Sequence, residues 1–392
     1  MKQIVFYCIA LLTTIPGCMI AKKQVINHIN WKVASTLPVP TGADKQPGLA
    51  GAWAGVHNHV LIVAGGANFP DTMPWLGGKK KYYTNVYVFT KNVDGNVITV
   101  NKTFHLPFPV AYGASCSTSE GIVCAGGENE NGISNKVLLM QWNAATTEVV
   151  FKTLPDLPVA VTNTSITVND NMVYLAGGEV TAGVSNQFLS LNVNNTSSGW
   201  KQLPALPKAV SHAAIAAQSD GDNTCIYLIG GRKRNANSTS DLYSFVYQFD
   251  LKDNRWKEKR SLPYALSAGT ALATGSNHIL LFSGDKGETF QKTEELIAAI
   301  NTEKDEAKKQ QLIQQKTELQ STHPGFSKDV LLYNTLTNAW AITDTIPFEG
   351  QVTTTAVKWE EDIIIPSGEI KAGVRTPRII AGKIPSQNQL FR

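Results

Sequence analysis

Val63-Ala64-Gly65-Gly66 is the stretch of sequence that decides the fold, because an apolar run ending in a glycine doublet recurs along the chain. Three further copies keep the doublet intact: Cys124-Ala125-Gly126-Gly127, Leu175-Ala176-Gly177-Gly178 and Leu228-Ile229-Gly230-Gly231. Two degenerate copies follow, Phe282-Ser283-Gly284-Asp285 and Ile365-Pro366-Ser367-Gly368. Most copies are followed by an aromatic- or apolar-rich segment, and then by a Trp and a Leu-Pro dipeptide. The chain is therefore built from one repeated unit.

A unit of about 50 residues that recurs six times predicts a β-propeller of the kelch type. We expect an all-β chain that forms a six-bladed kelch-type β-propeller with four strands in each blade. Small residues after a proline, as at 109–115, suit the innermost strand, which is crowded around the channel. The apolar run before each doublet is typical of a strand buried on both faces.

The two ends of the chain predict how the ring closes. Residues 31–38 resemble a fourth strand with no blade before it, whereas the last blade, from about Phe348, lacks a fourth strand. We expect the N-terminal strand to complete the C-terminal blade, because this pairing removes an open edge. Residues 22–392 then form a single propeller.

The bulk composition fits a core-rich domain and disfavours nucleic acid as a partner. Hydrophobic residues make up 43% of the 392 residues, charged residues 17%, and the formal net charge is +4. No basic cluster with interleaved aromatics stands out. Cys116, Cys124 and Cys225 suggest neither a disulfide framework nor a zinc site. Cys116 would face Val123 across a hairpin, so we expect buried free thiols, no metal and no cofactor.

The first 21 residues have the pattern of a signal peptide. Lys2 supplies a positive charge, and residues 4–15 form an apolar run too short to span a bilayer. Two cleavages fit the sequence: one after Ala21, and a lipoprotein-type cut before Cys18, although Pro16 suits the second pattern poorly. We expect a periplasmic or envelope-associated protein, with membrane attachment through a lipidated Cys18 if the second cut is used.

Two insertions interrupt the repeat at the same end of their blades. Residues 284–329 of blade five are rich in Glu, Lys, Gln and Ala, and they predict helices over about 288–325, with Thr302 and Asp305 as a capping box. This segment is either a solvated hairpin on the rim or a lid. Residues 68–83 of blade one carry aromatics and Lys79-Lys80-Lys81, which suit a ligand gate or simple packing over the rim.

The residues after the doublets form a predicted ring at one mouth of the channel. They are Asn68, Glu128, Glu179, Arg232, Asp285 and Glu369, and five of the six are charged. Turns before the inner strands add Tyr112, Asn163, His212 and Gln351. These groups could form salt bridges and caps between blades. As a set they favour a polar ligand pocket, because propellers commonly place their ligand sites there.

The last copy, residues 367–377, carries a Glu and an Arg six positions apart across a glycine-containing turn. Glu369 is suited to move protons, and Arg375 is suited to hold a carboxylate by a two-pronged hydrogen bond. Glu and Arg are common in loops, so the spacing alone is a weak signal.

Three segments resemble the bacterial N-acetylneuraminate epimerases, also called sialic acid mutarotases. They are residues 368–376 (Gly-Glu-x-x-x-Gly-x-Arg-Thr), residues 48–51 leading to 61–68, and residues 111–113 leading to 126–128. A weaker similarity extends over the whole propeller. In that family the first segment lies mid-chain and precedes the second, whereas here it is C-terminal. The order is consistent with a cyclic permutation, which a closed ring tolerates.

The resemblance implies an isomerase that interconverts the α- and β-anomers of N-acetylneuraminate without a cofactor. It implies Glu369 as the principal acid/base and Arg375 as the carboxylate anchor. Glu128 or Glu179 would be the second proton carrier, with Arg232 as an alternative anchor. Asn68, Asp285, Tyr112, His212 and Gln351 are the remaining candidates for substrate binding.

Other classes of propeller protein carry different motifs. A sialidase would carry Ser-x-Asp-x-Gly-x-Thr-Trp repeats, which the chain lacks, and a copper radical oxidase would need several grouped His ligands, whereas its seven His are scattered. A non-enzymatic kelch module that binds glycan or protein is the serious competitor, since fold alone does not establish catalysis. Another acidic sugar is a further alternative for the substrate.

Overall fold

The computed structural model describes residues 26, 28–40, 42–236 and 238–385, and they form six antiparallel sheets of four or five strands around a channel, with five two-stranded sheets at one end. The predicted six-bladed propeller is confirmed. Each blade is described from its innermost strand outward. Blade one has β2 (Trp53–His57), β3 (Val60–Ala64), β6 (Asn85–Lys91) and β7 (Val97–Thr99), with β8 (Phe104–His105) also on β6. Blade two has β9 (Ala114–Thr118), β10 (Gly121–Ala125), β13 (Val137–Asn143) and β14 (Glu148–Thr153). Blade three has β15 (Ser165–Asn169), β16 (Met172–Ala176), β19 (Phe188–Asn192) and β20 (Lys201–Gln202).

The other three blades repeat this order. Blade four has β21 (Ala214–Ser219), β22 (Thr224–Ile229), β25 (Val246–Asp250) and β26 (Arg255–Lys259). Blade five has β27 (Thr270–Thr274), β28 (His278–Phe282), β29 (Asp329–Asn334) and β30 (Ala339–Thr345). Blade six has β31 (Val357–Trp359), β32 (Asp362–Pro366), β35 (Arg378–Lys383) and, outermost, β1 (Asn30–Thr36).

The predicted closure by the N-terminal strand is confirmed, because β1 pairs with β35 in an antiparallel ladder. The strand is also fixed to the neighbouring blade five. The amide of Ile29 donates to the Asp344 carboxylate at 2.7 Å, and Trp31 packs edge-on against Phe282 with ring centroids 5.9 Å apart. The open edge of blade six is therefore covered and the ring closes on itself.

The cores lie between neighbouring blades, as the apolar runs predict. Ile62 of blade one and Ile122 of blade two are fully buried in a shared cluster with Met140. Gly55 permits this approach, because a Cβ there would lie 2.7 Å from the Ile122 side chain. The predicted pairing of Cys116 with Val123 is confirmed, and Cys116, Cys124 and Cys225 are buried free thiols.

A short hairpin follows the second strand of five blades, at the same end of the ring. These hairpins are β4 (Ala67–Asn68) with β5 (Lys81–Tyr82), β11 (Glu128–Asn129) with β12 (Gly132–Ile133), β17 (Glu179–Val180) with β18 (Gly183–Val184), β23 (Arg232–Lys233) with β24 (Asp241–Leu242), and β33 (Glu369–Lys371) with β34 (Val374–Arg375). Blade five has two helices instead, α1 (Glu288–Thr302) and α2 (Glu306–Ser321). Short 3-10 helices span Pro74–Leu76 (η1) and Thr196–Ser198 (η2).

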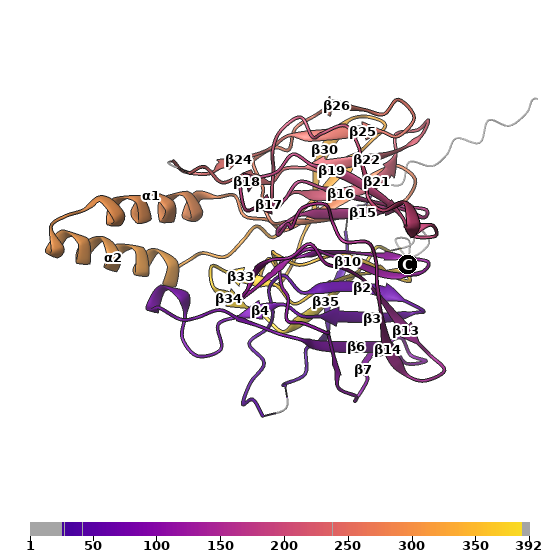
Figure 1. Cartoon of the computed structure of the whole chain (residues 1–392), viewed down its shortest axis with the longest axis horizontal. Coiled ribbons are helices and arrows are strands. Elements are labelled where there is room, and N and C mark those ends of the chain that lie inside the picture. Colours follow the sequence, from indigo (N-terminus) through magenta and orange to yellow (C-terminus); the bar gives the residue numbers. More distant parts are fainter. Residues whose placement is uncertain (1–25, 27, 41, 237, 386–392) are drawn as a thin grey trace, which may run out of the picture.

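The two helices form an antiparallel pair that projects from this end of the ring, to the left in Figure 1. The predicted capping box is wrong in one member. Asp305 does cap α2, since its carboxylate accepts from the Lys308 amide at 3.0 Å. Thr302 is instead the last residue of α1, and its hydroxyl donates back to the Ala298 carbonyl.

A closed ring of backbone hydrogen bonds surrounds the channel near the same end. Its members all have φ between 50° and 66°: Gly51, Tyr112, Asn163, His212, Ala268 and Thr353. Each amide donates to the carbonyl of the member in the preceding blade, with N···O distances of 2.7–3.1 Å. We call these residues the backbone ring. Gly51 is required there, because a Cβ would collide with Tyr112. The ring gives the cavity above it a rigid floor.

The segment expected to be a signal peptide, residues 1–21 with Cys18, lies outside the described residues. Within the described part of the chain, neither helix is long and apolar enough to span a membrane.

Candidate active site

A cavity of about 440 Å³ lies at the mouth of the channel, where the hairpins and helices meet. Eight of the residues expected at the mouth line it: Glu128, Glu179, Arg232, Asp285, Glu369, Tyr112, Asn163 and His212. The channel beyond the backbone ring has a smaller volume, about 130 Å³, and its walls are mostly Gly, Ala, Ser and Thr. The charged groups are therefore concentrated in the mouth cavity.

Glu369 and Arg375 face each other across the β33–β34 hairpin, as paired residues of its ladder. The Glu369 carboxylate accepts from the Gly373 amide at 2.6 Å and lies 3.6 Å from the Arg375 guanidinium. Glu369 lines the cavity, whereas Arg375 lies behind Glu369 and is not among the lining residues. Arg375 therefore contacts the site through Glu369 and Tyr112.

Arg375 is held in a nearly closed pocket, with a side chain 4% exposed. Its Nη2 donates to the Tyr112 hydroxyl at 3.3 Å, and its guanidinium carbon lies 4.8 Å from the centre of the Phe69 ring. Nε and Nη1 are buried and donate to no described residue. Burial opposes the charge, but Glu369 and Tyr112 outweigh it and raise the pKa of Arg375.

Lys80 of the shorter insertion lies against the same wall. Its ammonium group is 3.1 Å from the Glu128 carboxylate and 4.5 Å from the centre of the Tyr112 ring. Glu128 also accepts from the Tyr82 hydroxyl at 2.7 Å. Burial opposes the charge of Lys80, yet Tyr112 and Glu128 raise its pKa above the usual value. Two of the four lining acids, Glu128 and Glu369, thus have a cation beside them.

A second polar group comes from blades three and four. Arg232 Nη2 donates to His212 Nε2 at 3.1 Å, so the neutral imidazole carries its proton on Nδ1. His212 Nδ1 lies 3.2 Å from the Ser211 hydroxyl and 3.5 Å from the Glu179 carboxylate, and that hydroxyl donates to Glu179 at 3.0 Å. Burial and the cations Arg232 and Arg234 hold the pKa of His212 well below its usual value. His212 is therefore neutral at pH 7.

The base of the helical insertion forms one wall of the cavity. Phe290 of α1 covers Arg232, with the guanidinium carbon 4.3 Å from the ring centre. Glu294 fixes α1 to blade four, because its carboxylate accepts from the amide and the hydroxyl of Ser240 at 2.8 and 2.7 Å. The Thr317 hydroxyl of α2 reaches the Trp75 carbonyl of η1 at 3.5 Å. The two insertions therefore contact each other beside the mouth.

Two expected site residues do not line the cavity. Asn68 is buried, where it donates to the Gly48 carbonyl at 2.8 Å and accepts from the Tyr83 hydroxyl. Gln351 is also buried and donates to the carbonyls of Ser367 and Arg378. Gln351 precedes Val352, whose backbone pairs with Glu369, the residue after the doublet. The equivalent residue of blade two is the apolar Val110, which precedes Ala111, the backbone partner of Glu128. Thr353 is the ring member of this blade, so the expected register was two residues early.

Lys80, from the shorter insertion whose lysines suited a ligand gate, also lines the cavity. The sequence patterns did not point to the remaining lining residues, which are Arg234, Ala268, Thr289, Phe290, Thr293, Gln320, His323, Phe326, Val352, Thr353 and Ala372. Tyr112, Asn163 and His212 each lie two residues before an inner strand, and the same step would have found Ala268 before β27 but not Thr353, because β31 begins four residues after it. The residues from the insertions belong to no repeat, so the repeat carried no signal for them.

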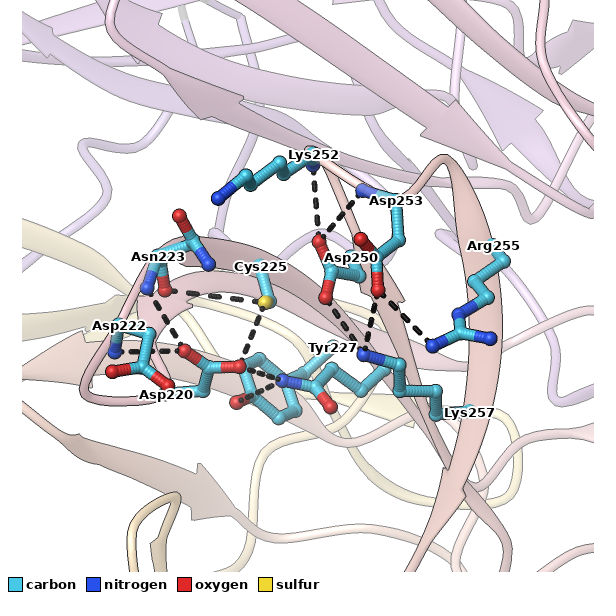
Figure 2. A network of polar contacts seen from close by, with 11 residues as sticks. Asp220, Asp222, Asn223, Cys225, Tyr227, Asp250, Lys252, Asp253, Arg255 and Lys257 are labelled. Carbon is cyan, nitrogen blue, oxygen red and sulfur yellow. Dashed lines mark hydrogen bonds and ion pairs between the residues drawn. The ribbon is translucent and has the colours of Figure 1, made fainter.

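One cluster away from the cavity has three metal-ligand side chains close together: Asp220, Cys225 and Asp250 (Figure 2). Its groups already have partners. The Cys225 thiol donates to Asp220, which also accepts from Gln248 at 2.9 Å, and Asp250 pairs with Lys257 at 2.7 Å. Burial raises the pKa of Cys225 to about 12, so the thiol is protonated. We interpret this cluster as a structural network.

The fold and cavity define a class: six-bladed kelch-type propellers with a charged ligand cavity at the channel mouth. The family model described as N-acetylneuraminate epimerase matches residues 18–149 and 154–391. The chain therefore belongs to the N-acetylneuraminate epimerase family.

Individual relatives match over part of their length. The N-acetylneuraminate epimerase of Haemophilus influenzae (strain PittEE) is 25% identical over 240 residues, which is 60% of either chain. That of Vibrio cholerae serotype O1 is 39% identical over 130 residues, 31% of this chain and 32% of the relative. A solved structure titled "Structure of YjhT" superposes with a TM-score of 0.60 at 14% identity, covering 89% of this chain and 96% of that one. This last likeness shows the shared fold.

Proposed function

We propose that this protein catalyses the exchange between the α- and β-anomers of N-acetylneuraminate. The observation that carries the proposal is the position of Glu369. Its carboxylate lines a cavity of about 440 Å³, held by the Gly373 amide and by Arg375. Pockets for small ligands have volumes of about 300–1,000 Å³. Membership of the epimerase family supports the same substrate.

Anomer exchange requires proton transfer and ring opening. A base removes the proton of the anomeric hydroxyl, and the bond between C2 and the ring oxygen breaks with its electron pair moving to that oxygen. Protonation of the ring oxygen gives an open-chain ketone, which recloses on its other face after rotation. We assign the acid/base role to Glu369. A positioned acid/base group contributes about 10²–10⁴-fold. The step moves protons and no redox electrons, so it needs no redox cofactor.

The geometry favours Arg232, with Arg234 beside it, as the anchor for the substrate carboxylate. Both residues line the cavity, and Arg232 is fixed by His212 and Phe290. Arg375 suits a different role. Its side chain is 4% exposed and lies behind Glu369, where it holds that carboxylate in place. This assignment favours Arg232, which the sequence analysis gave as the alternative anchor, over Arg375, which it gave first.

A proton NMR time course tests the activity. N-acetylneuraminate freshly released in the α form by a sialidase is followed with and without the protein, prepared from Lys22 onward, at the same pH and buffer. Growth of the β-anomer signals in proportion to protein concentration supports the proposal. A folded protein that leaves the rate unchanged contradicts it. Broadened sugar resonances would then favour a different acidic sugar, and unbroadened ones a non-catalytic propeller.

A further inference from the structure

His323 is a buried titratable group of the cavity that the mechanism above does not use. It follows α2, lines the cavity and is 4% exposed. The cavity wall that it forms comes from the insertion of blade five, outside the repeated unit. Asp285 precedes the insertion, and Glu369 is on the adjacent hairpin, so both lining acids are close to this wall.

The ring of His323 is fixed in one orientation. Its Nδ1 accepts from the Gly325 amide at 2.9 Å, and its ring lies 5.0 Å from that of Phe326 at 56°. Gly325 has φ +96°, a conformation that glycine adopts without strain. The segment is held to the blade by the Ser327 amide, which donates to the Gly284 carbonyl at 2.9 Å. The imidazole is therefore positioned before a ligand arrives.

The hydrogen bond from Gly325 also fixes the tautomer. Because Nδ1 accepts, the proton of the neutral ring is on Nε2, which has no hydrogen-bond partner among the described residues. Burial lowers the pKa of His323 and Lys371 lowers it further, against the opposing charges of Asp285 and Glu369. At pH 7 the ring is neutral and offers one N–H, from Nε2.

We infer that His323 is a further catalytic residue, whose Nε2–H donates a hydrogen bond to the ring oxygen of the sugar as the ring opens. The inference rests on the proposed function. Glu369 takes the proton of the anomeric hydroxyl while the bond from C2 to the ring oxygen breaks. The electron pair moves to that oxygen, Nε2–H stabilises its charge, and Glu369 returns the proton to it. The protein ends in its starting protonation state, and no second carboxylic acid is required.

Two substitutions separate this role from packing. His323→Phe keeps a ring against Phe326 and removes the donor, whereas His323→Gln retains an N–H donor near the position of Nε2. Removal of one preorganised donor to a developing oxyanion costs about 10²–10³-fold in kcat. We expect His323→Phe to lower kcat by about 10²-fold with little change in KM, and His323→Gln to recover most of that loss. His105→Phe, at the exposed position of strand β8, is the matched control.

The assay is the anomer exchange followed by NMR over a range of sugar concentrations, with melting temperatures recorded for every variant. Gly325→Ala strains the turn that orients the imidazole, and a partial loss of kcat there supports the inference even if His323→Phe does not fold. A folded His323→Phe with wild-type kcat overturns the inference, as does a His323→Gln as slow as His323→Phe. Both results leave the proposed function intact. An inactive wild-type protein would instead refute the proposed function and this inference together.

Discussion

Replacement of Arg232 by Gln tests which arginine binds the substrate carboxylate. The guanidinium lines the cavity, donates to His212 Nε2 at 3.1 Å and packs on Phe290 at 4.3 Å. Its Nε is buried and donates to no described residue. The glutamine side chain is shorter and uncharged, so it cannot form a two-pronged bond with a carboxylate. We expect the substitution to weaken binding far more than it slows the chemical step.

The magnitude follows from the type of bond that is lost. A hydrogen bond to a charged group contributes about 1.5–3 kcal/mol. Since 1.4 kcal/mol corresponds to a factor of ten, KM should rise by about 10- to 150-fold. Arg232 also lowers the pKa of His212. Its removal should therefore raise the pKa of His212 toward the ordinary value, while burial still keeps it below that value.

The assay is the dependence of the NMR exchange rate on sugar concentration, together with the His212 pKa from a proton NMR titration. Arg375→Lys is the comparison variant, because it keeps a cation beside Glu369 and should lower kcat more than it raises KM. Arg232→Gln with wild-type KM would refute the assignment of the anchor. A larger rise of KM in Arg375→Lys, with kcat unchanged, would restore Arg375 to that role.

Three further predictions concern the scaffold. Gln351→Ala removes two hydrogen bonds to the carbonyls of Ser367 and Arg378. The free energy of unfolding, measured with urea, should fall by about 1–3 kcal/mol. We expect an unchanged KM, and a large rise in KM would place Gln351 in the site after all. Lys257 holds the pKa of Asp250 at about 2. The stabilisation from this pair is therefore present above about pH 4 and is lost as the pH falls through 2, so Asp250→Asn should be less stable than the wild type at pH 7 and should equal it only below about pH 2. A deficit independent of pH in acid denaturation would contradict the pairing. Replacing residues 297–314 by a short turn removes the projecting ends of α1 and α2 but keeps Phe290, Gln320 and His323. If only the base of the insertion forms the site, kcat/KM should stay within about threefold of the wild-type value. A loss above about tenfold would favour a lid that closes over the cavity with the ends of the two helices.

The repeat predicted the fold and most of the cavity because propeller geometry places equivalent residues at equivalent positions. Each doublet ends a buried strand, so the next residue must lie at the mouth, and Glu128, Glu179, Arg232, Asp285 and Glu369 all do. Asn68 is the exception. Its blade carries the shorter insertion, and its amide is bound by Gly48 and Tyr83 of the local chain.

The remaining features depend on contacts that sequence patterns do not encode. Because Gln351 is polar, we expected it at the channel mouth. Its amide instead donates hydrogen bonds to two carbonyls, in a position that is apolar in other blades. Phe290 and His323 reach the cavity only because α1 is fixed to Ser240 and the segment after α2 returns to Gly284. The burial of Arg375 behind Glu369 likewise follows from tertiary packing against Phe69. Spacing alone could not separate an anchor from a positioning residue.

The most direct measurement is the rate of anomer exchange in Glu369→Gln. The variant keeps the size of the side chain and an oxygen that can accept from the Gly373 amide, but it cannot take up a proton. Glu361→Gln is the matched control, because Glu361 is exposed in the turn between β31 and β32. With N-acetylneuraminate released in the α form, we expect wild-type protein and the control to accelerate β-anomer growth equally, and Glu369→Gln to lose about 10²-fold or more of that acceleration. A folded Glu369→Gln with wild-type turnover would contradict the account.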